Sequence, residues 1–397
     1  MNVIQAMNAH LDRLRPVALA VGALATIACI AGVIVNQEQF FHSYLFAFLF
    51  WLGLAMGSLG IEMIHHLTGG VWGFVIRRVL EAASMTLPLL GLLFLPIFFG
   101  MHANFLWTHP DVVAPVPELR HKTEFFLNVP WFIGRAVFYF LVWSGMAWLL
   151  RRWSLQQDKT GDPAITQHFQ HACGPGLVIF FLTMSIAAVD WIMSLEPRWY
   201  STTFGLVVIS GQGLAALAFA ILSAISLTGH KALSDMVKPK AFHDLGNLLL
   251  AFMLMWAYLA FTQYLIIWSG NLSDESTWYI HRGHGGWQTI GLALILFHFL
   301  LPFVALLFGT LKKNYRSLAI IALYILVAHI LDVFYLVLPT FYTRGFHVHW
   351  LDVACFVAIG GWWLAGFSWI MRGKSPVPLH DPRLEGVFNA EEAVQRG

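Results

Sequence analysis

Charged residues are scarce in this sequence. Asp, Glu, Lys and Arg together make up 11% of the 397 residues, whereas 58% of the residues are hydrophobic. Water-soluble domains carry about 25% charged residues, and disordered chains carry few aromatic ones. This chain contains 33 Phe and 17 Trp. The shortage of charge therefore excludes both classes and indicates an all-α polytopic membrane protein.

Cysteine is also rare. The three that occur, Cys29, Cys173 and Cys355, lie far apart and show no CxxC spacing. They supply neither a disulfide framework nor the thiolate ligands of a zinc or iron–sulfur site. The chain also lacks a Gly-rich phosphate loop and the basic stripe that nucleic acid requires. We therefore expect no metal site in this chain and no nucleic-acid partner.

Long apolar runs dominate what is present. About twenty apolar residues cross the hydrocarbon core of a bilayer. Arg13 and Arg15 precede the first run, but no small-residue cleavage site follows it, so we expect an uncleaved helix there. The ten predicted transmembrane helices cover residues 16–35, 43–64, 76–99, 130–150, 175–194, 202–227, 245–269, 287–310, 317–338 and 350–371.

The segments between the runs are rich in Gly, Pro, Asn and His. The longest predicted loops are residues 101–128, 151–174 and 271–286. We assign residues 1–371 to a single transmembrane domain. The polar residues 372–397 form a predicted tail, either extended on the surface of a partner or disordered.

The distribution of positive charge predicts the topology. Lys and Arg are concentrated in the N-terminal segment, the even-numbered loops and the C-terminal tail. The positive-inside rule places such segments in the cytoplasm. We therefore expect both termini to be cytoplasmic, with Asp190 and Glu196 at the outer face.

Several ionisable side chains fall inside or beside the predicted spans, where a buried charge costs a few kcal/mol. At the cytoplasmic end of the second helix, Glu62 is followed by His65 and His66 at helical spacing, so both histidines can reach the acid. Arg78 and Glu81 begin the next helix. This set is either an ion-pair network that anchors the hairpin or the inner mouth of a proton route.

A second polar pair is predicted near the outer face. Arg135 lies early in the fourth helix and Asp190 lies near the end of the fifth. At 1.5 Å per residue, both are roughly 6–8 Å below the same surface. Equal depth on consecutive antiparallel helices predicts a buried ion pair, which is either structural or part of proton or quinol chemistry.

A third polar set lies later in the chain. His298 is at the middle of the eighth helix, and His329 and Asp332 lie three residues apart on the ninth. The two histidines can be axial haem ligands, hydrogen-bonded packing residues, or a relay with Asp332. Asp352, at the start of the tenth helix, is interpreted as a surface acid or a cap. Residues 281–287 form either a Gly-rich turn with aromatic anchors or a contact loop for an outer partner.

Three stretches carry a resemblance to a known family. They are DWIMSLEPRWYSTTFG at 190–205, GNLLLAFMLMWAYLAFTQYLIIWSGN at 246–271, and WYIHR at 278–282 before Gly286 and Trp287. With them the chain closely resembles the F subunit of bacterial alternative complex III, a quinol:electron-acceptor oxidoreductase, within the NrfD/polysulfide-reductase-like integral membrane subunits. The resemblance covers essentially all ten helices.

This resemblance implies a fold and a setting. It implies two four-helix bundles, helices 2–5 (about residues 43–194) and helices 6–9 (about residues 202–338), flanked by helices 1 and 10. It places the chain in the bacterial cytoplasmic (inner) membrane. The implied partners are a sister NrfD-like membrane subunit, an iron–sulfur subunit, multihaem cytochrome c subunits and a terminal oxidase. Haem c and iron–sulfur clusters would belong to those partners, and the quinone would be menaquinone or ubiquinone.

The expected role is support of quinol oxidation in a respiratory or photosynthetic complex, with protons moving through intramembrane polar residues. The role most often suggested for such subunits is proton conduction through the first bundle, and whether quinone binds in this chain stays open. The alternatives are a secondary transporter with a midplane site and a cytochrome b-type membrane anchor. The candidates for the proton route are Glu62, His65, His66, Arg78, Glu81, Arg135, Asp190, His298, His329 and Asp332.

Overall fold

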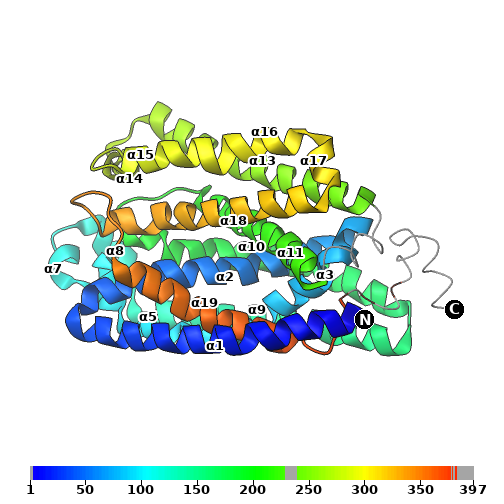
Figure 1. Cartoon of the computed structure of the whole chain (residues 1–397). Coiled ribbons are helices and arrows are strands. Elements are labelled where there is room, and N and C mark those ends of the chain that lie inside the picture. The colour runs from blue at the N-terminus through cyan, green and yellow to red at the C-terminus, as the bar shows by residue number, and fades with distance from the viewer. Residues whose placement is uncertain (1–2, 229–238, 377, 379–380, 382–397) are drawn as a thin grey trace.

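A computed structural model describes residues 3–228, 239–376, 378 and 381. These residues form helices and turns, and none of them lies in a β-strand. Ten helical segments are long and apolar enough to cross a membrane. They run side by side along one direction (Figure 1). The prediction of an all-α polytopic membrane protein with ten spans is therefore confirmed.

Eight of the spans are single helices. The third span is broken into three helices, and the eighth contains a π-helical segment. The single helices are α1 (Val3–Val35), α2 (Gln37–Thr68), α9 (Val129–Thr160), α10 (Ala164–Trp191), α11 (Phe204–Thr228), α13 (Pro239–Gly270), α18 (Tyr315–Val337) and α19 (Trp350–Met371). The third span comprises α3 (Val71–Ser84), α4 (Leu87–Leu93) and α5 (Leu95–Phe99). The eighth comprises α15 (Trp287–Ala293), the π-helical segment Leu294–Leu300 and α16 (Leu301–Leu307).

Proline accounts for the breaks. Pro88 and Pro96 each follow the first residue of a new helix in the third span, because proline has no N–H to continue the preceding turn. Pro302 opens α16 in the same way, directly after the π-helical segment. The kinks that these prolines allow are therefore present.

The predicted loop at residues 151–174 is wrong. Helix α9 continues to Thr160 and α10 begins at Ala164, so only three residues separate them. Hydropathy registers the apolar part of a helix and not its polar extension, although residues such as Leu, Arg and Gln there favour helix. Gly161, with φ 64°, ends α9 in the left-handed conformation that glycine adopts without strain.

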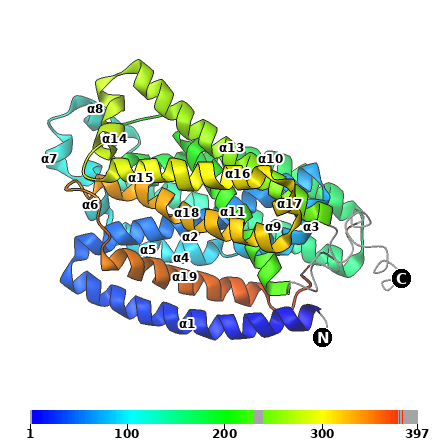
Figure 2. The same ribbon diagram turned by 45° about the horizontal axis from the view of Figure 1, so that its top comes forward.

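The other two long loops contain short helices. Residues 101–128 include α6 (Met101–Asn104), a 3₁₀ turn at Leu106–Thr108, α7 (Pro110–Val113) and α8 (Pro117–Phe125), and residues 271–286 include α14 (Ser273–Arg282). Helices α7, α8 and α14 lie at the end of the molecule opposite the start of α1 and α17 (Gly309–Lys313) (Figures 1 and 2). Most of the predicted tail, residues 372–397, lies outside the described residues.

Helices α2 and α11 form the centre of the protein. All of the most apolar window of α2 and 89% of that of α11 are buried, compared with 22% for α1. Helix α2 packs on α3 and α10, and α9 packs on α4 and α10. Helix α11 packs on α13 and α18, and α16 and the π-helical segment also contact α18. With α1 lying along α19, this grouping agrees with two four-helix bundles flanked by the first and tenth helices (Figure 2).

Glycine permits the close approach of the two central helices. A Cβ added at Gly57 of α2 would lie 2.1 Å from the carbonyl oxygen of Gln212 on α11 and 2.7 Å from Cβ of Ala216. Small residues at such contacts allow helix backbones to approach closely in membrane proteins. The joint between the two bundles therefore depends on the missing side chain at Gly57.

Candidate functional site

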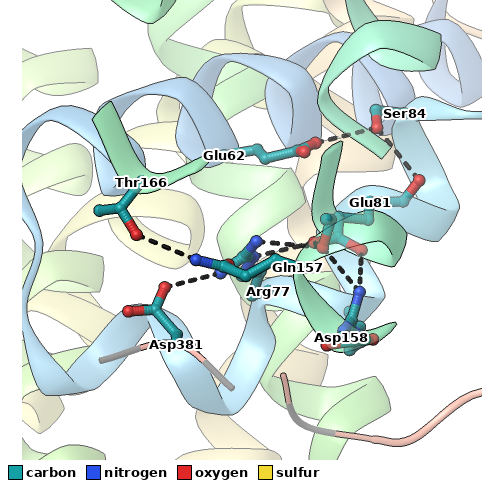
Figure 3. Close-up of polar contacts among 10 residues, drawn as sticks. Glu62, Arg77, Glu81, Ser84, Gln157, Asp158, Thr166 and Asp381 are labelled. Atoms are coloured by element: carbon teal, nitrogen blue, oxygen red, sulfur yellow. Dashed lines mark hydrogen bonds and ion pairs between the residues drawn. The ribbon is translucent and has the colours of Figure 1, made fainter. Parts of the chain in front are cut away.

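The first polar site is centred on Glu81, which is 1% exposed and bound by two arginines. Arg77 Nε lies 2.9 Å from Glu81 Oε1, and Arg78 Nη1 lies 2.7 Å from Oε2. The hydroxyl of Ser154 on α9 donates to Glu81 Oε1 at 2.5 Å. We call this group, with Glu62 and Ser84, the α3 cluster (Figure 3).

Both arginines of the α3 cluster have a second acidic partner. Arg77 Nη1 lies 3.0 Å from Asp381 Oδ2, and Arg78 forms an ion pair with Asp158 of α9. The acids compensate the buried guanidinium groups, which would otherwise be costly in a membrane interior. The cluster thereby joins α3 to α9 and to the described part of the C-terminal segment. The sequence indicated Arg78 and Glu81 as candidates, but not the contribution of Ser154 and Asp158 from another helix.

Glu62 differs from Glu81 although the two acids share this cluster. Glu62 is 1% exposed, and its Oε2 accepts a hydrogen bond from Ser84 at 3.1 Å. Ser84 also lies 3.2 Å from the carbonyl oxygen of Glu81, so its hydroxyl links the two residues. Among the described residues, Oε1 of Glu62 has no hydrogen-bond partner, and no cationic side chain forms an ion pair with this acid. Glu62 is thus a buried acid held by a neutral hydroxyl.

The two histidines after Glu62 make aromatic contacts. His66 stacks on Phe169 of α10 at 3.9 Å between ring centroids. His65 meets Trp72 and Phe74 edge to face at 5.2 and 5.0 Å. The sequence predicted that both histidines can reach Glu62. The hydrogen bond described for the acid comes from Ser84 instead, because the histidine rings point into the aromatic contacts between α2, α3 and α10.

The predicted ion pair between Arg135 and Asp190 is confirmed. Arg135 binds Asp190 through two bonds, Nε to Oδ2 at 2.9 Å and Nη2 to Oδ1 at 2.6 Å. Nη2 also donates to the carbonyl oxygen of Phe126, whose ring lies 3.9 Å from the guanidinium carbon. Tyr139 donates to Asp190 Oδ2 at 2.8 Å. Sequence reasoning missed Tyr139, although it lies one helical turn after Arg135 on the same face of α9.

The third predicted set also comes together, at the middle of the second bundle. His298 is fully buried in the π-helical segment, and its ring centroid lies 5.8 Å from that of His329. His329 Nδ1 lies 3.3 Å from Asp332 Oδ2, within ion-pair distance. Trp256 of α13 packs edge to face against His298 at 4.4 Å. Among the described residues, neither ring nitrogen of His298 nor Nδ1 of His329 has a hydrogen-bond partner, so the proximity of His329 to Asp332 does not distinguish a relay from packing or haem ligation.

A further buried ion pair was not predicted. Arg282 of α14 is 2% exposed and donates from Nη1 to Glu196 Oε1 at 2.9 Å, with its guanidinium carbon 3.6 Å from the ring of Trp278. It also donates to the carbonyl oxygens of Tyr335 and Leu336. Burial lowers the pKa of Arg282, and Glu196 opposes this shift. Arg282 therefore fixes the turn after α10 through Glu196. Its role is structural, because its buried guanidinium is not exposed for contact with an outer partner.

The remaining acid named from sequence, Asp352, is a cap. Its Oδ2 accepts from the backbone N–H of His349 at 2.8 Å in a capping box that starts α19. Ser43 and Tyr342 donate to its Oδ1 at 2.6 and 3.0 Å. Asp352 is 2% exposed, so it is a buried cap and not a surface acid.

Within the described parts of the chain, no group of three or more His, Cys, Asp or Glu residues is arranged to hold a metal ion. The ionisable groups instead form separated polar sites inside an apolar helical protein: the three predicted from sequence and the pair of Arg282 and Glu196. This combination defines the chain as a polytopic α-helical membrane protein with charged residues in the interior of its bundles. No family model matches the chain, and no curated protein matches its sequence.

Proposed function

We propose that the chain is an integral membrane subunit of a quinol:electron-acceptor oxidoreductase of the alternative complex III type, and that its first bundle conducts protons. The long segments at 190–205 and 246–271 support the family assignment by their resemblance to such subunits. Glu62, which lies inside α2, supports the proton role, because an ionisable side chain inside a membrane span marks a functional site by default.

The main support for a role in proton transfer is the environment of Glu62. A purely structural acid is expected to be compensated as Glu81 is, by two guanidinium groups and a hydroxyl. Glu62 has a single described hydrogen bond, from Ser84, and one oxygen without a partner among the described residues. Its proton can therefore be gained and lost without breaking an ion pair, which is what a proton carrier requires.

In this proposal, Glu62 is the proton carrier at one end of the first bundle. Asp190 lies on α10, which packs against α2, and belongs to the other end of the same bundle. Tyr139, which bonds Asp190, supplies a hydroxyl that can relay a proton. His298, His329 and Asp332 are proposed as a second relay in the other bundle.

Replacing Glu62 by Gln tests this proposal in the intact native complex. Gln keeps the size of the side chain and its bond to Ser84 but cannot carry a proton. We expect the number of protons released per electron to fall, while quinol is still oxidised. The matched control is Glu38→Gln, which removes an exposed acid from the same helix and leaves the proton yield unchanged. An unchanged proton yield in Glu62→Gln would remove Glu62 from the route.

The family assignment has its own test. Purification of the native assembly is expected to yield an iron–sulfur subunit and multihaem cytochrome c together with this chain, and quinol-dependent reduction of an electron acceptor. Isolation of the chain alone, with substrate flux in liposomes, would favour a transporter instead. A reduced-minus-oxidised haem spectrum from the purified single chain would favour a cytochrome b-type anchor, with His298 and His329 as the ligand pair.

A further inference from the structure

A groove of about 500 Å³ opens on the surface of α9 near its C-terminal end. Arg151 on its wall donates to the carbonyl oxygen of Ile370 at 2.7 Å, which places the groove beside the end of α19. We call it the α9 groove. Its wall includes Trp148, Arg151, Arg152 and Lys159.

The charge of the α9 groove has one sign. Arg151, Arg152 and Lys159 line it, and no acidic residue of the described chain does so. Asp158, the nearest acid in sequence, pairs with Arg78 on the buried side of α9. Its carboxylate therefore does not neutralise the positive charge of the groove. Arg152 and Lys159 are exposed to an anion there, and Arg151 lies beside them with its guanidinium bonded to Ile370.

The cations follow an apolar stripe on the same face of α9. Val137, Leu141 and Trp148 are 50%, 68% and 51% exposed and recur at helical spacing. Arg152 follows Trp148 by four residues, with its guanidinium carbon 5.2 Å from the indole ring, and Lys159 follows seven residues later. The face thus changes from exposed apolar side chains to an aromatic ring and then to basic groups.

We propose that the α9 groove binds the phosphate headgroup of an anionic phospholipid, with the acyl chains lying along the apolar stripe. A phospholipid has apolar chains that match the apolar stripe and a charged headgroup that matches the basic groups beyond it. A free anion would contact the basic groups only. Arginine binds phosphate oxygens through paired N–H donors, and basic pockets between membrane helices take anionic headgroups. This inference does not depend on the proposed proton route.

The test compares lipids on the full-length chain in neutral detergent micelles. Phosphatidylglycerol and phosphatidylcholine of equal chain length are titrated, and lipid bound to the intact chain is counted by native mass spectrometry. We expect phosphatidylglycerol to be retained in preference to phosphatidylcholine. Equal retention of the two lipids, or competition by inorganic phosphate at the same concentration as the lipid, would overturn the proposal.

The matched variants are two double substitutions. Arg152→Gln with Lys159→Gln removes two cations of the groove and spares Arg151, which binds α19. Lys313→Gln with Arg316→Gln removes two exposed cations, at the end of α17 and the start of α18, that do not line the groove. We expect the first to weaken phosphatidylglycerol binding about thirtyfold, by the usual contribution of two basic residues, and the second to leave it unchanged. Equal loss in both variants would show non-specific charge attraction and overturn the site.

Discussion

The two acids of the α3 cluster show how strongly individual partners define the role of a buried side chain. Glu81 and Glu62 are equally buried, yet Glu81 is bound by Arg77 and Arg78 while Glu62 is bound by Ser84. A buried ion pair is costly to break, because either charge alone is left without compensation. Substitutions of Glu81 are therefore expected to affect folding, and substitutions of Glu62 to affect function.

The pair of Arg135 and Asp190 gives a direct test of this reasoning. Asp190→Ala leaves the guanidinium of Arg135 and the hydroxyl of Tyr139 without their shared acceptor. We expect the free energy of unfolding to fall by about 3 kcal/mol, measured by unfolding in detergent. Asp111→Ala, at an exposed position in α7, is the control and is expected to be neutral. Removing both partners with Arg135→Met and Asp190→Leu should recover part of the loss, and no recovery would contradict a dominant pairwise interaction.

Tyr279, on α14 outside the spans, gives a prediction about alkaline pH. Burial raises the pKa of Tyr279 to about 12, above its ordinary value of 10. The folded state keeps the phenol proton that the unfolded state has lost, so the stabilisation is present below pH 10 and disappears as the pH rises towards 12. In that window the free energy of unfolding falls by at most about 1.4 kcal/mol per pH unit.

We therefore expect Tyr279→Phe to flatten the dependence of the unfolding midpoint on pH between 10 and 12. The variant also loses the bond that Gln263 donates to the phenol oxygen at 3.3 Å. Loss of this bond lowers stability by the same amount at all pH values, whereas loss of the titrating phenol changes the slope. Measuring the midpoint for both proteins across this range separates the two effects. The same slope in both proteins would contradict a protonated phenol in the folded state.

The central helices α2 and α11 carry the main prediction about packing. Gly57→Ala would place a methyl group 2.1 Å from the backbone oxygen of Gln212, which only separation of the helices can relieve. We expect a loss of about 1–3 kcal/mol, typical of an overpacked core, measured as a lower unfolding midpoint in detergent.

The matched control for Gly57→Ala lies on α9. An added Cβ at Gly145 meets no atom within 4 Å. Gly145→Ala is expected to be neutral or to stabilise by up to about 1 kcal/mol, since alanine favours helix over glycine. Equal destabilisation by both substitutions would show that helix propensity, not the contact with α11, decides the outcome.

The apolar parts of the helices could be predicted from the hydropathy of the sequence. All ten spans and the kinking prolines could be found, because each depends on local composition. The polar extension of α9 through Thr160 could not, because its residues are hydrophilic and its partners lie on other helices. Equal depth below the surface predicted the pair of Arg135 and Asp190. The same argument does not apply to Glu196 and Arg282, which lie 86 residues apart. One is in a turn and the other in a short helix, both outside the spans, so counting residues along a transmembrane helix does not give their depth.

The alternating arrangement of the spans leads to a prediction about the orientation of the whole protein. The three native cysteines are buried, so they give little background in surface labelling. With both termini in the cytoplasm, a membrane-impermeant maleimide applied to intact cells should label Asp274→Cys on α14 and not Lys313→Cys at the opposite end. Both positions are exposed, and both should be labelled after the membrane is opened. The reverse pattern would contradict the topology predicted from the Lys and Arg distribution.

The complete burial of α2 has a consequence for how the protein is made. Helix α2 leaves the ribosome before α10, α11 and α19, which pack around it. Until they arrive, Glu62 and the two histidines beside it face lipid or the insertion machinery, where an uncompensated polar residue is unfavourable. Biogenesis therefore requires that this nascent span be retained or shielded until the later helices close around it, and truncation before α19 should leave an intermediate that is prone to degradation.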